Sequence, residues 1–151
     1  MTVGPWTKGI YPSIVSVNPS GEVRRHSVDA SGMVGSGYSI GTGWKGRNIT
    51  MIDMGSGRQG LLGRSGTRLY FQPSTGQGPF QGPASVVASA GWGDTTALSS
   101  VQGHFRDNFG LLSVKRSGEL QYISANKTGF AGIITYPMDL RGSMMAGSQS
   151  F

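Results

Sequence analysis

The fold of this chain is indicated by the stretch LLSVKRSGELQYI at residues 111–123. An apolar pair leads into a Ser-Gly turn, and a second apolar run follows the turn. Because glycine adopts the positive φ that a tight turn requires, this pattern predicts a β-hairpin. Two related stretches are IVSVNPSGEVRRH at residues 14–26 and LLGRSGTRLYF at residues 61–71. Three copies separated by about 45–52 residues are typical of a repeat architecture.

The composition favours a chain built from strands and turns. Of its 151 residues, 26 are glycine, and hydrophobic residues make up 36%. This glycine content, together with dispersed aromatic side chains, is typical of many short strands joined by tight turns. No window of the sequence keeps the 3.6-residue apolar period of a helix, so no helix is expected. The predicted fold class is therefore all-β.

The hairpins divide the chain into three predicted repeats of four short antiparallel strands, within a single domain. The repeats span residues 1–54, 55–105 and 106–151. Phe105 and Phe151 stand at equivalent repeat ends, so the chain is expected to hold three whole repeats. The predicted strands are 13–17, 22–28, 38–40, 49–54, 60–62, 69–71, 86–88, 97–101, 111–114, 120–123, 133–136 and 143–146.

A further pattern follows each hairpin: a glycine-rich loop with an aromatic residue, then Gly-Trp, then an apolar strand. Gly-Trp occurs at residues 43–44 and 91–92, and Pro137-Met138 stands nearby where the third repeat lacks it. This pattern resembles the repeats of bacterial β-propellers of the FG-GAP/VCBS and tachylectin-like lectin types. The resemblance implies that each repeat is one four-stranded propeller blade and that the protein binds sugars. The calcium loop of FG-GAP repeats is only hinted at by residues 106–110, so no metal is predicted.

Three blades raise a question of closure, because propellers have typically 4–8 blades around a channel. Two copies of the chain would together close a six-bladed ring, which would make the protein a homo-oligomer. A larger assembly would also cover the open edges. The alternative fold is a β-trefoil, a monomer with internal three-fold symmetry. The turn motifs favour the propeller, whereas the length and number of the repeats favour the trefoil.

Five aromatic residues are candidates for ligand binding. Trp44 and Trp92 recur at the same place in two repeats, and an indole can stack on the C–H face of a sugar. Tyr38, Phe80 and Phe130 recur in the glycine-rich loops and form the second set of candidates. The alternative is that all five pack between neighbouring repeats, because large aromatic side chains dominate the energetics of protein cores.

The charge balance favours an anionic partner. The chain has 13 basic and 7 acidic residues, which gives a net charge of +6. Basic residues stand beside every hairpin: Arg24, Arg25, Arg64, Arg68, Lys115 and Arg116. The positive electrostatic potential of these residues attracts glycans or an anionic surface polymer. Repeated weak contacts along such a partner add up to tighter binding. The alternative is that these charges only maintain solubility and protect exposed strand edges. No nucleic-acid motif is present, so nucleic acid is not expected as a partner.

Catalytic and cofactor chemistry find no support in the residue pattern. Cysteine is absent, and the two histidines, His26 and His104, have no metal-ligand spacing. No enzyme activity, metal or cofactor is therefore predicted. The segment Met1–Trp6 has no features of a signal peptide, and no stretch is long enough for a membrane helix. The compartment stays open, with the cell exterior and a virion surface as candidates.

These observations predict a non-enzymatic, lectin-like protein that recognises cell-surface or wall glycans. The alternative function is a structural subunit of a larger particle, such as a virion decoration or fibre protein. A small, basic, glycine-rich β-chain suits the coating of an acidic shell.

Overall fold

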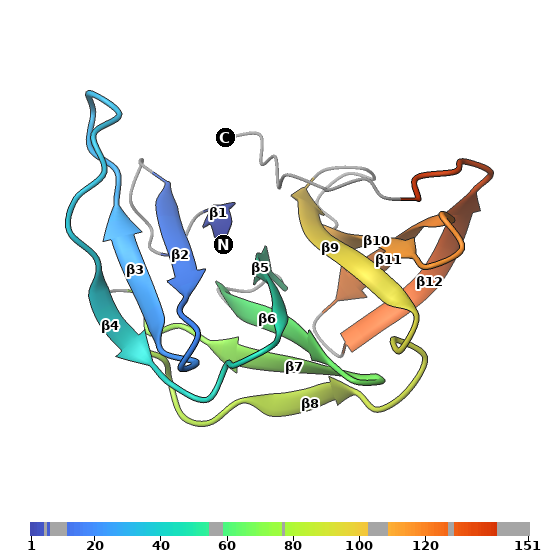
Figure 1. Cartoon of the computed structure of the whole chain (residues 1–151), viewed down its shortest axis with the longest axis horizontal. Helices are drawn as coiled ribbons and strands as arrows, with labels where there is room; N and C mark the ends of the chain where they lie inside the picture. The colour runs from blue at the N-terminus through green and yellow to red at the C-terminus, as the bar shows by residue number, and fades with distance from the viewer. Residues whose placement is uncertain are drawn as a thin grey trace.

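The described part of the chain consists of strands and turns without helices (Figure 1). The computed structural model describes residues 1–4, 6, 12–54, 59–76, 78–102, 109–126 and 129–141. The strands are β1 (Thr2–Gly4), β2 (Ser13–Val17), β3 (Val23–Ser27), β4 (Tyr38–Gly41), β5 (Asn48–Asp53), β6 (Gln59–Ser65), β7 (Arg68–Pro73), β8 (Ser85–Ala88), β9 (Thr95–Gln102), β10 (Phe109–Lys115), β11 (Leu120–Asn126) and β12 (Gly129–Tyr136). The all-β prediction is confirmed.

The described strands form three separate antiparallel sheets of four strands each. The first sheet has the order β1-β2-β3-β4, the second β5-β6-β7-β8, and the third β9-β10-β11-β12. Every strand of a sheet thus pairs with its neighbour in sequence. A β-trefoil would join strands of all three repeats in one closed barrel, and the described strands do not form one. The trefoil alternative is therefore not supported.

The three predicted Ser-Gly hairpins connect the second and third strands of each sheet. Their glycines have positive φ angles, which are 88° at Gly21, 58° at Gly66 and 93° at Gly118. Only glycine adopts such angles without steric strain, so these positions fix the turns. The hairpin of the second sheet is the shortest, because Ser65 pairs directly with Arg68.

The second and third sheets take their first strand from the predicted repeat that precedes the one supplying their other three strands. The predicted strand 49–54 is β5 and pairs with β6 in the second sheet. The predicted strand 97–101 is β9 and pairs with β10 in the third sheet. The first strand of the first sheet is β1, which the sequence did not predict. The predicted strand 143–146 lies outside the described residues.

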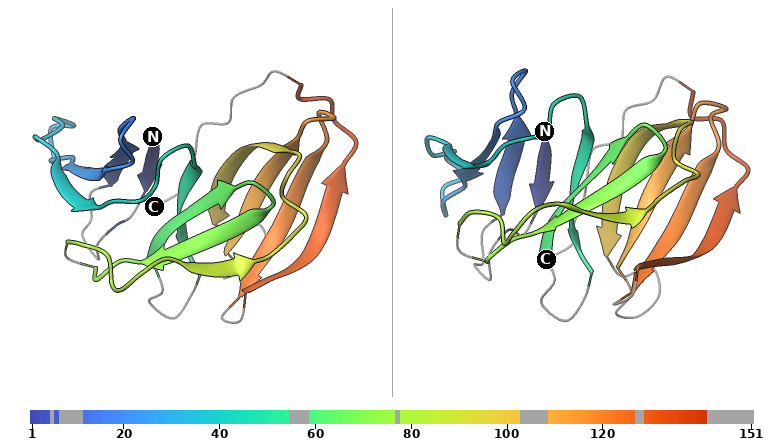
Figure 2. Two further views of the ribbon diagram at one scale, coloured as in Figure 1. Left: turned by 60° about the horizontal axis from the view of Figure 1, so that its bottom comes forward. Right: turned by 90° about the horizontal axis from the view of Figure 1, so that it is seen from below.

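The three sheets fan out from their first strands, β1, β5 and β9, of which β5 lies next to both others (Figures 1 and 2). Two apolar clusters fill the spaces between neighbouring sheets. The cluster between the first and second sheets contains Trp6, Val15, Val23, Ile40, Trp44, Met51 and Leu61. The cluster between the second and third sheets contains Ile52, Met54, Leu62, Leu69, Phe71, Trp92, Leu98, Leu111, Ile123 and Ala125. Burial of these side chains holds the sheets together.

Candidate functional site

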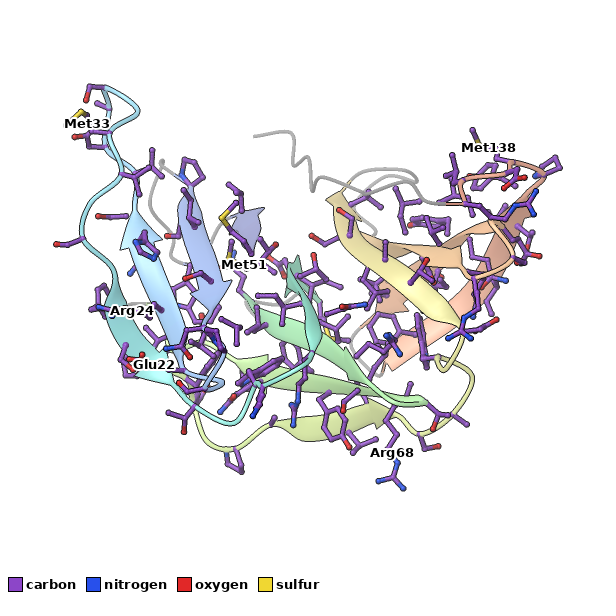
Figure 3. The ribbon with its side chains drawn as sticks, viewed as in Figure 1. Glu22, Arg24, Met33, Met51, Arg68 and Met138 are labelled. Carbon is purple, nitrogen blue, oxygen red and sulfur yellow. The ribbon has the colours of Figure 1, made fainter. Side chains whose placement is uncertain are left out.

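The side chain of Trp44 belongs to the core cluster between the first and second sheets. The same cluster contains Met51, which is labelled in Figure 3. Only 1% of Trp44 is exposed. Its Nε1 donates a hydrogen bond to Oε1 of Gln72 over 2.9 Å. Its ring stacks on Phe80 with 5.9 Å between centroids, and the guanidinium of Arg47 lies 4.9 Å from its centroid. The indole therefore has no free face for a sugar.

Trp92 occupies the corresponding place between the second and third sheets, where it is 9% exposed. Its ring meets Phe130 edge to face, with 6.2 Å between centroids. Nζ of Lys115 lies 5.8 Å from the indole centroid and 2.9 Å from Oδ1 of Asp94. The structure thus pairs each candidate tryptophan with a candidate aromatic of the following sheet, in an arrangement that favours packing over ligand contact.

The ion pair beside Trp92 predicts a small pH dependence of stability. Lys115 lowers the pKa of the Asp94 carboxyl, chiefly by donating a hydrogen bond to it. A lowered folded-state pKa means that the pair stabilises the fold above the ordinary pKa of aspartate, and that this contribution disappears as the pH falls through the lowered pKa. Asp94→Asn should therefore reduce the loss of melting temperature between neutral pH and about pH 3. The difference should shrink in high salt, because the carboxylate is 61% exposed. Identical pH profiles of the two proteins at low salt would show that the pair contributes nothing.

The loop after each sheet is tied to the hairpin of that sheet by a repeated backbone hydrogen bond. The donors and acceptors are Trp44 N to Gly21 O (3.1 Å), Trp92 N to Thr67 O (3.3 Å) and Leu140 N to Gly118 O (2.8 Å). Leu140 therefore takes the backbone position of the tryptophan in the third sheet, which the sequence placed near Pro137-Met138. A leucine at this position shows that the loop does not depend on an indole.

Tyr38 differs from the other four candidates because its side chain is exposed. It begins β4, and 43% of its surface is open to solvent. Nη1 of Arg25 donates a hydrogen bond to the Tyr38 hydroxyl over 2.6 Å, and Nε of Arg25 donates to Oγ of Ser13 over 2.9 Å. The guanidinium carbon lies 5.8 Å from the phenol centroid. Tyr38 and Arg25 thus form an exposed and oriented pair, which we call the Tyr38 site.

Arg24 and His26 contact the segment that leads into Tyr38. Both alternate with Arg25 along β3, so their side chains lie on the other face of that strand. Arg24, which lies on β3 and is labelled in Figure 3, donates from Nη2 to the Gly37 carbonyl over 2.6 Å. The ring of His26 lies 3.3 Å from the Gly35 carbonyl and packs directly against Gly37, where a Cβ would collide with it. These contacts fix the approach to the Tyr38 site without occupying the phenol.

The partners of the candidate aromatics were missed in the sequence. Gln72 and Arg47 carry no motif of their own, and Gln72 is 28 positions away from Trp44. In the sequence, Arg25 stands out only as one of two adjacent basic residues near a hairpin. Its pairing with Tyr38 depends on a β-bulge between β3 and β4, which shifts the register after Val23. No local pattern signals that shift.

Within the described residues, no three histidine, aspartate or glutamate side chains gather in a way that could hold a metal ion. None of the described segments is a helix with the length and apolar character needed to cross a membrane. Comparison with protein-family models, with curated proteins and with solved structures gave no match to this chain.

Proposed function

We propose that this chain is a non-enzymatic carbohydrate-binding protein that contacts glycans through the Tyr38 site. One observation carries the proposal: Tyr38 is the exposed member of the five candidate aromatics, and Arg25 orients it. A phenol ring offers a face for the C–H groups of a sugar. The adjacent guanidinium supplies donors for sugar hydroxyls or carboxylates. The net charge of +6 would raise the local concentration of acidic glycans.

The proposal includes the interpretation of the three sheets as propeller blades. Each sheet is a four-stranded meander, and consecutive sheets follow one another along the chain. Their first strands gather while their last strands point outward (Figure 1). This arrangement supports the blade interpretation, since propellers are built from four-stranded sheets around a centre.

Glycan binding by the wild-type protein and by Tyr38→Ala tests the function. We expect the wild-type protein to bind acidic wall or cell-surface glycans on an array, and Tyr38→Ala to bind them about tenfold more weakly, which corresponds to about 1.4 kcal/mol. Val86→Ala is a matched control, because Val86 is similarly exposed, at 48%, on another sheet. Equal binding by Tyr38→Ala and the wild-type protein would contradict the proposed site. Absence of binding to every glycan would contradict the function.

A structural role in a larger particle is the second candidate. The observation in its favour is that three large apolar side chains on and after β12 are exposed, on both sides of the strand, namely Ile133, Ile134 and Met138. Exposed apolar groups of this kind often mark protein contacts. Ordered high-mass assemblies in sedimentation and in electron micrographs of the purified protein would support this role, whereas monomers or dimers alone would contradict it.

A further inference from the structure

Among the described residues, no sheet covers the surface of the first sheet that faces away from the second. Along a strand, neighbouring side chains point to opposite faces. Val15 belongs to the core between the first and second sheets, so Ile14 points the other way. Val3 and His26 lie directly opposite Ile14 on the two flanking strands. We call the row Val3, Ile14 and His26 the first-sheet face.

Five of the six residues at the same positions in the other two sheets are buried, and Gln72 is partly exposed. The equivalents of the row are Met51, Leu61 and Gln72 in the second sheet, and Ser100, Leu111 and Ile123 in the third. Val3 is 38% exposed, whereas Met51 and Ser100 are 1% and 4% exposed. Ile14 is partly exposed, whereas Leu61 and Leu111 are fully buried. In each buried case the cover is the preceding sheet, and in the first sheet no preceding sheet exists among the described residues.

A hydrogen bond repeats at the two internal junctions. Oγ1 of Thr2 in β1 accepts from the backbone N–H of Met51 in β5 over 3.2 Å. Oγ1 of Thr50 in β5 accepts from the backbone N–H of Ser100 in β9 over 3.0 Å. The donors sit at the repeat position that Val3 occupies in the first sheet. The internal junctions are thus copies of one interface, and the first-sheet face is one half of it.

The surface that would complete this interface lies on the third sheet, where it is partly exposed. Leu111 faces the second sheet, so Leu112 and its cross-strand neighbours point away from it. Leu112 and Leu120 are partly exposed there, and Ile134 is 39% exposed, whereas Tyr122 and Val114 on the same face are buried. The equivalents of the two leucines are fully buried in both other sheets: Val15 and Val23 in the first, Leu62 and Leu69 in the second. We call Leu112, Leu120 and Ile134 the third-sheet face.

We infer that the third-sheet face of one copy of this chain docks on the first-sheet face of a second copy. The two faces are the complementary halves of an interface that the chain already forms twice within itself. Two copies can make two such head-to-tail contacts and close a ring of six sheets, which lies within the usual range for propellers. The Tyr38 site stays outside this contact, because Arg25 alternates with His26 along β3 and faces the other side. The inference does not depend on carbohydrate binding.

Mass in solution tests the inference. Sedimentation and native mass spectrometry should give about twice the 15.9 kDa of one chain at micromolar concentration. Val3→Asp and Ile134→Asp should each give monomers, because each places a charge in both junctions of the ring. Two matched controls should remain dimeric: Val86→Asp, on the second sheet, and Ile133→Asp, whose side chain lies on the opposite side of β12 from Ile134. A wild-type monomer at every concentration, or dimers of Val3→Asp, would overturn the inference.

Mixing the two monomeric variants provides a further test that a misfolded protein could not pass. In a mixed ring, one junction holds both aspartates, while the other joins an unchanged first-sheet face to an unchanged third-sheet face. The mixture should therefore form dimers that neither variant forms alone, at an affinity below that of the wild-type protein. Monomers in the mixture, with both variants folded by circular dichroism, would rule out a head-to-tail contact.

Discussion

Replacing Trp44 with alanine should lower the free energy of unfolding by about 3–5 kcal/mol, as deletion of a large buried aromatic side chain does. The indole is 1% exposed, stacks on Phe80 and donates a hydrogen bond to Gln72. Its loss leaves a cavity between two sheets and an amide oxygen without its donor. Such a loss is a large fraction of the stability of about 5–15 kcal/mol that is typical of a domain.

Urea unfolding monitored by circular dichroism measures this effect, with Tyr38→Ala as the control. Tyr38 is exposed, so its truncation should lower the free energy of unfolding by less than about 1 kcal/mol. The two variants separate the two roles that the sequence left open for the aromatics. A loss of less than about 1 kcal/mol for Trp44→Ala would contradict the packing role and restore the indole as a candidate for ligand contact.

The hairpins could be predicted because their signals are local. An apolar pair, a glycine that must adopt positive φ and a second apolar run lie within about a dozen residues. The assignment of β5 and β9 to sheets could not be predicted in this way. Each follows a glycine-rich loop and pairs with the strand after it rather than the strand before it, a choice that strand propensity does not determine.

The candidate site was predicted less well than the fold. Periodicity places Trp44 and Trp92 at equivalent positions, yet it does not say whether an indole at that position faces solvent or a neighbouring sheet. Phe80, which lies between β7 and β8 of the next sheet, stacks on the Trp44 ring and helps to bury it. Exposure of Tyr38 has a similar origin, because the side chains around it depend on the register of β3 and β4.

Gly63→Ala is the other substitution with a large expected effect. It tests the junction between the first and second sheets from the side of β6, which packs against the Trp44 ring. A Cβ at position 63 would lie 2.5 Å from Cζ3 and 3.0 Å from Cε3 of Trp44. The indole is held by its own partners, so the added methyl group must displace a packed ring. Overpacking of this kind destabilises proteins by about 1–3 kcal/mol, and we expect a loss in that range.

Gly78→Ala is the control for this substitution, since a Cβ there meets no described atom within 4 Å apart from its chain neighbours, and its φ is not positive. It should change the free energy of unfolding by no more than about 0.5 kcal/mol. A double-mutant cycle then assigns the cause. With alanine at position 44 the ring is absent, so Gly63→Ala should lose most of its effect, and the coupling energy should reach about 1 kcal/mol or more. Additive losses would show that Gly63 is required for a reason other than the close approach of Trp44 to β6.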